Sequence, residues 1–324
     1  MELYLKQALD SVVHQTMADI EIICIDDCST DNSFSILNEY AKNDKRFVVI
    51  KHKCNQGLGE TRNDGLNVVT GEYIMFLDPD DWLELDACEK AYNQISKNKD
   101  DVVFFNSQTC DVDGNILSVN RKLSAYKKHL DGKTFSLKKI KGNFLIRKIS
   151  CWTRIYDSEF IRRNNIYMAE TRRAEDILFS LKIYLNAENV SVLNAVLYNY
   201  RAQPSYRVFK ELENIDDAYI NLKEAYLLVK NNPDNGYILK HFLVYLIDVC
   251  IMKRYYGFIC NRNQKALLYK KSRKLLKYIN KREKIKKIYE KIDVVKYKLF
   301  LLCPNSFIYE IAYKMYMKIF ADNK

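Results

Sequence analysis

The first two thirds of the chain alternate between short apolar runs and segments in which apolar residues recur every three to four positions. The first pattern predicts buried β-strands and the second predicts amphipathic helices. Alternating strands and helices are typical of an α/β fold, a doubly wound sheet flanked by helices. The predicted strands cover residues 20–25, 47–51, 73–77, 101–106 and 190–200, and the predicted helices cover 3–15, 32–42, 85–95 and 177–185.

The alternation stops after Arg201, and from Leu212 onward the pattern is helical. A long segment over 262–298 keeps apolar residues on one face and basic residues on the other. The apolar positions that define this face are Ile285, Ile288, Ile292, Val295 and Leu299. We therefore expect two parts, an α/β domain over residues 1–208 and a helical, basic C-terminal region over 209–324.

The positive charge of the chain is local. The formal net charge is +11, and residues 262–298 hold fifteen Lys or Arg against three Asp or Glu, so the rest of the chain is nearly neutral. Basic amphipathic helices of this kind bind anionic membrane surfaces. The alternative is a solvated basic face whose apolar stripe packs on the first domain. Because the basic residues are confined to one stretch without a recognition motif elsewhere, we expect no nucleic-acid partner.

Cysteine and histidine usage indicates a reduced compartment and no zinc site. The nine Cys are scattered, mostly within apolar runs, and no pair has C-x-x-C spacing. The N-terminus lacks the pattern of a signal peptide, and the uncharged apolar runs are too short to span a bilayer. We expect a cytoplasmic protein, with the basic helices as candidates for peripheral contact with the inner face of the cytoplasmic membrane.

The stretch from Gly71 to Trp82, GEYIMFLDPDDW, places three carboxylates at the end of a predicted strand. In open α/β sheets ligands bind outside the carboxyl ends of the strands, so Asp78, Asp80 and Asp81 would project toward a substrate. Carboxylates packed within a few ångströms are costly unless a cation shares them, and a hard divalent ion that also binds phosphates is the usual solution. The alternative is a solvated Asp-Pro turn that caps the next helix.

Two other segments carry candidate chemistry near predicted strand ends. Asp26 and Asp27 follow the strand over 20–25, and their turn leads into a helix. The glycine-containing loop over 55–65 would let backbone amides approach a phosphate or a base, with Arg62 supplying charge. An ordinary loop and helix cap is the alternative.

Further along the chain, Glu175 and Asp176 precede an apolar helix. A helix dipole favours acidic residues at that position, whatever their function. Trp152 offers an aromatic face suited to a sugar, although burial in the core is the commoner fate of a tryptophan.

The order and spacing of these segments resemble glycosyltransferase family 2, the inverting nucleotide-sugar enzymes of the GT-A (Rossmann-like) fold. The resemblance covers about residues 2–206 and is greatest to bacterial members that build lipooligosaccharide, capsular and other surface glycans. It rests on IEIICIDDCSTDNS, NQGLGETRNDGL, TGEYIMFLDPDDWLELDA, CWTRIYDSEFIRRNNI, AEDILF and LYNYR.

On the donor side, the resemblance implies that Asp27, with Asp26 beside it, reads the uracil ring and that Arg62 lies near the base. It implies that Asp80 holds the Mg²⁺ or Mn²⁺ that bridges the two phosphates, and that Asp78 lies near the ribose and the metal. Asp81 receives no role from it.

On the acceptor side, the resemblance implies that Asp176 is the catalytic base and that Trp152 and Arg154 face the acceptor, with Glu175 beside the base. It also places the segment over 110–148 toward the acceptor. The implied reaction is transfer of a sugar from a nucleotide-sugar, here a UDP-sugar, to a glycan or glycolipid with inversion. One base and one metal ion suffice for such an in-line displacement.

The chain departs from the family pattern in two places. Cys28 stands where relatives usually have Gly, and the sequence begins at the first helix, without the Val-Ile-Ile-Pro strand and Tyr-Asn loop that open the domain in relatives. That strand is central in a sheet of order 3-2-1-4, so we expect a sheet without its first strand and a chain that folds poorly. An inactive, truncated glycosyltransferase and a nucleotidyltransferase with a similar sheet are the alternative functions.

Overall fold

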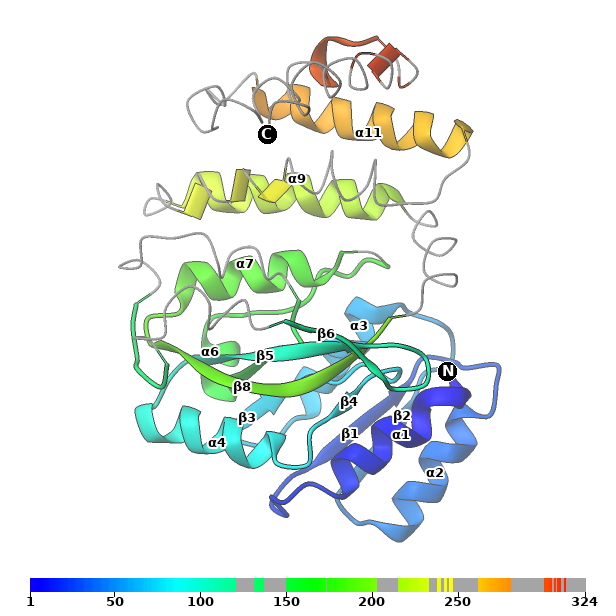
Figure 1. The fold of residues 1–324 in the computed structure, drawn as a ribbon, viewed down its shortest axis with the longest axis vertical. Coiled ribbons are helices and arrows are strands. Elements are labelled where there is room, and N and C mark those ends of the chain that lie inside the picture. Colours follow the sequence, from blue (N-terminus) through cyan, green and yellow to red (C-terminus); the bar gives the residue numbers. More distant parts are fainter. Residues whose placement is uncertain are drawn as a thin grey trace. The chain divides into compact units, whose positions relative to one another are not determined.

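The computed structural model describes residues 1–120, 131–136, 150–172, 174–202, 215–232 and 262–280, together with short pieces within 238–246 and 300–312. The chain divides into two compact units, Met1–Pro204 and Ser205–Lys324. The first unit contains the sheets, and the described part of the second is helical (Figure 1).

The first unit begins with a small parallel sheet. Strands β1 (Ile22–Asp26) and β2 (Phe47–Lys51) pair in register, with Ile22 opposite Phe47. Helices α1 (Glu2–Val13) and α2 (Ser33–Asn43) lie against this sheet (Figure 1). The apolar residues that recur along these helices form a core with the strands, made of Leu5, Leu9, Ile22, Leu37 and Phe47.

A larger mixed sheet forms the rest of the unit. Its order is β3-β7-β5-β8-β4, and β6 pairs with β5. Strand β5 runs parallel to β8 and antiparallel to β7 and β6. The strands are β3 (Tyr73–Met75), β4 (Trp82–Leu83), β5 (Val102–Cys110), β6 (Ile116–Asn120), β7 (Arg154–Asp157) and β8 (Val190–Arg201).

Helices cover both faces of β5, which explains its continuous apolar run. Helix α4 (Ala87–Asn98) packs on the face that bears Val103 and Phe105. On the opposite face the Phe104 ring stacks on Tyr184 of α7 (Asp176–Asn186), with ring centroids 6.2 Å apart. Successive strand residues point to opposite faces, so a strand buried on both sides reads as unbroken apolar sequence.

The two sheets are separate in the described part of the chain. β1 has β2 as its strand partner and β3 has β7, so each presents a second edge without one. The hydrophobic pattern predicted most of the longer elements, but it did not predict strand β6 or helix α3 (Leu58–Val68), which begins within the loop expected over 55–65. Nor did it predict β4, β7 or helix α6 (Ser158–Arg163). Each of these is too short to show a period.

In the second unit, the apolar stripe of α11 (Arg262–Asn280) packs against α9 (Ile215–Asn231). The Tyr219 hydroxyl lies 2.6 Å from Oγ of Ser272, and Leu268 and Leu276 are fully buried. The apolar positions predicted beyond residue 280 lie outside the described residues. In the part of the chain that the structure describes, no helix has both the length and the apolar character needed to cross a bilayer.

Candidate active site

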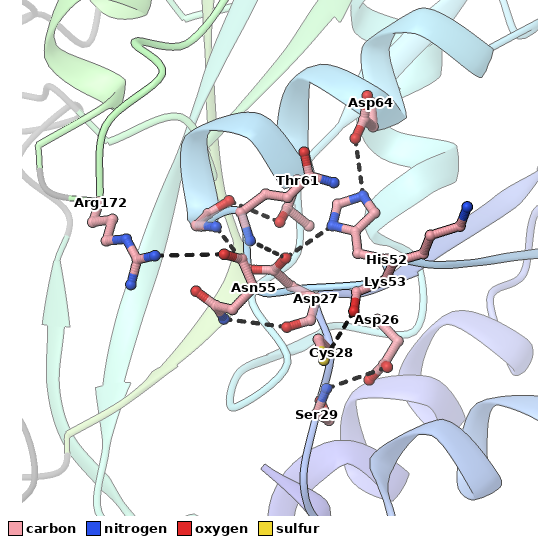
Figure 2. A network of polar contacts seen from close by, with 12 residues as sticks. Asp26, Asp27, Cys28, Ser29, His52, Lys53, Asn55, Thr61, Asp64 and Arg172 are labelled. Atoms are coloured by element: carbon pink, nitrogen blue, oxygen red, sulfur yellow. Dashed lines mark hydrogen bonds and ion pairs between the residues drawn. The ribbon is translucent and has the colours of Figure 1, made fainter.

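The carboxylate of Asp27, directly after β1, organises the loop that follows β2 (Figure 2). Its Oδ1 accepts the amide N–H of Gln56 at 2.7 Å, and its Oδ2 accepts the amide N–H of Gly57 at 2.8 Å. Gly57 has φ of +94°, a conformation that glycine adopts without strain. Burial acts to raise the pKa of Asp27, but the Gln56 amide, the His52 ring and the Gly57 amide outweigh it, so the pKa lies below its usual range.

Asp26 is buried and stabilises the turn that follows β1. The residue is only 3% exposed, and its Oδ2 accepts the amide N–H of Ser29 at 3.3 Å. Cys28 adopts φ of +60°, so this turn has the left-handed conformation that glycine reaches more easily than other residues. The departure at Cys28 therefore leaves the turn intact.

Arg62 joins three elements of the first unit. It projects from α3 (Leu58–Val68), and one guanidinium nitrogen lies 2.6 Å from Oδ1 of Asp78 while another lies 2.8 Å from Oε1 of Glu175. The Arg62 side chain is 10% exposed, so solvent screens these ion pairs weakly. The resemblance implied that Arg62 lies near the nucleotide base, and in the structure its partners are Asp78 of the Asp-Pro-Asp-Asp turn and Glu175.

Asp176 begins α7 next to this ion-pair network. Burial raises the pKa of its carboxyl to about 7, and the negative charge of Glu175 acts in the same direction while Arg62 opposes it. A carboxylate whose pKa lies near neutrality is suited to accept a proton at physiological pH. The structure therefore brings together Arg62, Asp78, Glu175 and Asp176, which are far apart in the sequence.

The loop before α7 packs directly on the first turn of α3. The side chain of Asn63 donates to the Met168 carbonyl at 3.2 Å and accepts the Met168 amide N–H at 2.8 Å. A Cβ placed on Gly59 would lie 2.1 Å from the Ala169 carbonyl oxygen. Gly59 is thus required by close packing, and this close approach keeps the loop before α7 beside α3.

We expect Gly59→Ala to lower the free energy of unfolding by about 1–3 kcal/mol, because the Ala169 backbone must move to admit the methyl group. Gly65→Ala, on the same helix, is the matched control, since its Cβ would meet only the Ile25 side chain at 3.6 Å. That change should be neutral or stabilising by about 0.5–1 kcal/mol. Urea denaturation measures both, and equal effects would contradict the packing argument.

A buried network holds the Asp-Pro-Asp-Asp turn in place. The Tyr198 hydroxyl donates to Oδ2 of Asp81 at 2.8 Å, and the Arg201 amide N–H donates to Oδ1 at 2.8 Å. The Arg201 guanidinium also donates to the Asp80 carbonyl at 2.9 Å. Asp81 is 1% exposed, and burial raises its pKa to about 7. Its function is therefore to fix the turn, and the LYNYR motif supplies its partners, which sequence reasoning had not assigned.

The carboxylates of Asp78 and Asp80 fit a divalent cation that a substrate completes. The described residues contain no group of three His, Cys, Asp or Glu side chains that would hold a metal alone. Mg²⁺ is commonly bound by one or two carboxylates together with substrate phosphates. Two aspartates on one fixed turn provide that donor set.

The two residues predicted to face the acceptor have different environments. Arg154 is fully buried, its guanidinium donates to Ser180 at 3.2 Å and to Tyr184 at 3.0 Å, and it stacks over the Phe104 ring. The prediction that Arg154 faces the acceptor is therefore wrong, because β7 turns this side chain into the core.

Trp152 is partly buried and makes aromatic contacts within the fold. Its ring stacks on those of Tyr198 and Tyr200, with centroids 4.6 Å and 5.5 Å apart. The contact with Tyr198 places Trp152 next to a residue that holds the Asp-Pro-Asp-Asp turn. Packing against these two rings accounts for part of the indole surface, and the side chain stays only partly buried.

The sequence model described as "Glycosyl transferase family 2" matches residues 2–164. The chain belongs to glycosyltransferase family 2. EpsH of Bacillus subtilis (strain 168) is 32% identical over 266 residues, which are 78% of this chain and 74% of EpsH. The poly(ribitol-phosphate) beta-N-acetylglucosaminyltransferase TarS of Staphylococcus aureus (strain Mu50 / ATCC 700699) is 28% identical over 233 residues, which are 71% of this chain and 37% of TarS.

The fold of this glycosyltransferase agrees with solved structures of other glycosyltransferases. S. aureus TarS 1-349 in complex with UDP-GlcNAc superposes with a TM-score of 0.66 at 22% identity, covering 85% of this chain and 77% of that one. The mannosyltransferase PcManGT of Pyrobaculum calidifontis, in complex with GDP-Man and Mn²⁺, gives 0.54 at 12% identity, covering 87% and 73%. These likenesses confirm the predicted GT-A fold.

Proposed function

We propose that this glycosyltransferase transfers a sugar from a UDP-sugar to a glycan or glycolipid acceptor in bacterial surface-polysaccharide synthesis, with inversion and with a divalent cation. The observation that carries the proposal is the convergence of Arg62, Asp78, Glu175 and Asp176 beside a loop of backbone amides. The complexes of TarS with UDP-GlcNAc and of PcManGT with Mn²⁺ support the donor class and the metal.

On the donor side, we assign nucleotide binding to Asp27 and to the loop that it holds. A carboxylate offers about four acceptor sites, and the Asp27 side chain remains 19% exposed after its contacts with the loop amides. Asp78 and Asp80 would hold Mg²⁺ or Mn²⁺, which when bound offsets the negative charge that grows on the departing nucleoside diphosphate. Arg62, already paired with Asp78, would keep that carboxylate oriented.

On the acceptor side, Asp176 accepts the proton of the attacking hydroxyl. A hydroxyl is a poor nucleophile until a carboxylate within hydrogen-bond reach takes its proton, and the raised pKa of Asp176 favours that transfer near neutrality. The Glu175 carboxylate is paired with the Arg62 guanidinium at 2.8 Å, so we assign the role of proton acceptor to Asp176. The exposed part of Trp152 is the proposed surface for an acceptor sugar.

The test is slow hydrolysis of a panel of UDP-sugars by the pure protein with Mn²⁺. We expect one donor to be hydrolysed faster than the others and the rate to fall to background when the metal is chelated. Release of pyrophosphate when the protein is given UTP and a sugar 1-phosphate, without hydrolysis of any UDP-sugar to UDP, would favour a nucleotidyltransferase. No hydrolysis and no UDP binding would indicate an inactive glycosyltransferase.

We also propose that α11 attracts the protein to anionic membranes by charge alone, because its apolar stripe is buried within its own unit while Lys270, Lys274 and Lys277 are exposed. Each lysine near such a surface contributes about 1 kcal/mol. Changing all three to Gln should weaken binding to vesicles with anionic lipid by about two orders of magnitude. The matched variant with three Arg residues should bind as before, and insensitivity of the parent protein to high salt would contradict the proposal.

A further inference from the structure

His52 lies between two carboxylates that come from different elements (Figure 2). Its Nδ1 is 2.8 Å from Oδ1 of Asp27, at the end of β1, and its Nε2 is 2.9 Å from Oδ2 of Asp64, on α3. The ring itself directly follows β2, and its side chain is only 5% exposed. The amide N–H of His52 donates to the Asp26 carbonyl at 2.9 Å, which fixes the backbone against β1.

The chemistry of the neighbours determines the state of the ring. A carboxylate can only accept, so Nδ1 carries the proton that it donates to Asp27. At Nε2 the contact with Asp64 is an ion pair at short distance without the alignment of a hydrogen bond. That second contact therefore depends on the charge of the imidazolium more than on hydrogen-bond geometry.

Two titratable groups face the ring from the elements packed against it, Asp27 from the β1 end and Asp64 from α3. Burial alone would lower the pKa of His52, but hydrogen bonding and charge from Asp27 and Asp64 outweigh it, so the pKa lies above its usual value. The imidazolium is thus stabilised in the fold.

Both carboxylates that contact His52, Asp27 and Asp64, are connected to the loop over 53–57. Asp27 holds the amides of Gln56 and Gly57, and Asn55 donates to the Asp27 carbonyl at 3.1 Å. Asp64 lies on the helix into which the loop runs. An unsupported Asp27 would have to hold two amides of a glycine-containing loop without any side chain behind it, and a binding residue needs such support to stay in position.

We propose that His52 is a positioning residue for the nucleotide donor: by bridging Asp27 and Asp64 it holds the amide loop in its binding geometry, and its loss of a proton loosens that loop. This inference rests on the proposed function, because the loop is taken to bind the nucleotide.

The inference predicts a sign for the pH dependence. A group whose pKa is raised in the folded protein contributes fully below its free value of about 6.5 and loses its contribution as the pH rises through the raised value. The dissociation constant for UDP in the presence of Mn²⁺ should therefore increase as the pH is raised from about 6.5 to about 8.5. Comparing variants with the same ligand cancels the titration of UDP itself.

Two substitutions separate the halves of the bridge. His52→Asn places an amide nitrogen near the position of Nδ1 and keeps the contact with Asp27, whereas His52→Gln reaches toward Asp64 and loses that contact. We expect His52→Asn to bind UDP with the affinity of the parent at high pH and to show no pH dependence. We expect His52→Gln to bind about tenfold more weakly at every pH, which corresponds to the loss of one charged hydrogen bond. His14→Asn, on an exposed ring at the end of α1, is the control and should keep the parent profile.

Calorimetry with UDP and Mn²⁺ gives the dissociation constants, and thermal melting reports whether each variant is folded. If His52→Gln does not fold, the pH profile of His52→Asn alone decides the question. A parent and a His52→Asn variant with the same pH profile would overturn the inference while leaving the proposed function standing. A parent that binds no UDP at any pH would overturn both, and loss of the profile in His52→Asn with retention in His14→Asn would support it.

Discussion

Asp176→Asn should reduce sugar transfer by about 10²–10⁴-fold, the usual contribution of a general base. The affinity for the UDP-sugar should persist, because the substitution removes a proton acceptor and leaves the Arg62 contacts with Asp78 and Glu175 in place. The loss should therefore appear in kcat rather than in donor binding. Single-turnover transfer and calorimetry measure the two quantities separately.

The pH profile adds a second check on Asp176. Because its carboxyl pKa is raised to about 7, the base is protonated and inactive at low pH, so kcat/KM of the parent should rise with pH and level off above about 7. The Asp176→Asn variant should not show this rise of kcat/KM with pH. Glu170→Gln, at an exposed position in the loop that precedes α7, is the matched control and should transfer sugar at the parent rate. Full activity of Asp176→Asn would refute the assignment.

Asp80→Ala should abolish the metal-dependent part of donor binding. The Arg201 guanidinium holds the turn through the backbone carbonyl of residue 80, and the Asp81 carboxylate is held by Tyr198, so the turn should survive loss of the side chain. What the variant lacks is one of two carboxylates available to a cation shared with the diphosphate. UDP should then bind equally with and without Mn²⁺.

Calorimetric titration of UDP with and without Mn²⁺ measures this effect. Asp19→Ala, at an exposed position in the loop before β1, removes the same charge from the protein and should retain the metal dependence of the parent. If Asp80→Ala binds UDP with Mn²⁺ as tightly as the parent does, the metal is held elsewhere and the assignment is wrong.

The sequence predicted most of the longer elements of the first unit, but it assigned residues 55–65 to a loop where the structure has helix α3. The strand over 47–51 agrees with β2 at both ends, and the predicted helix over 177–185 agrees with α7 within one residue at each end. Short elements such as β4 were missed because two residues carry no pattern. The basic segment over 262–298 was predicted as one amphipathic helix, and the described part of it, α11, is helical with its apolar face buried.

The sequence by itself determined that the protein is an α/β glycosyltransferase. Strand, acidic turn and helix recur in a fixed order and spacing, which local propensity and short motifs indicate directly. Only the tertiary structure decided which charged residues meet. Arg154 lies in the core, and Asp81 accepts hydrogen bonds from Tyr198 and Arg201. Arg62 pairs with Glu175, which is 113 positions away in the sequence. His52 lies between Asp27 and Asp64. Hydrophobic periodicity specifies which face of an element is buried, whereas the partner of a charge depends on which elements pack together, and that information is not local.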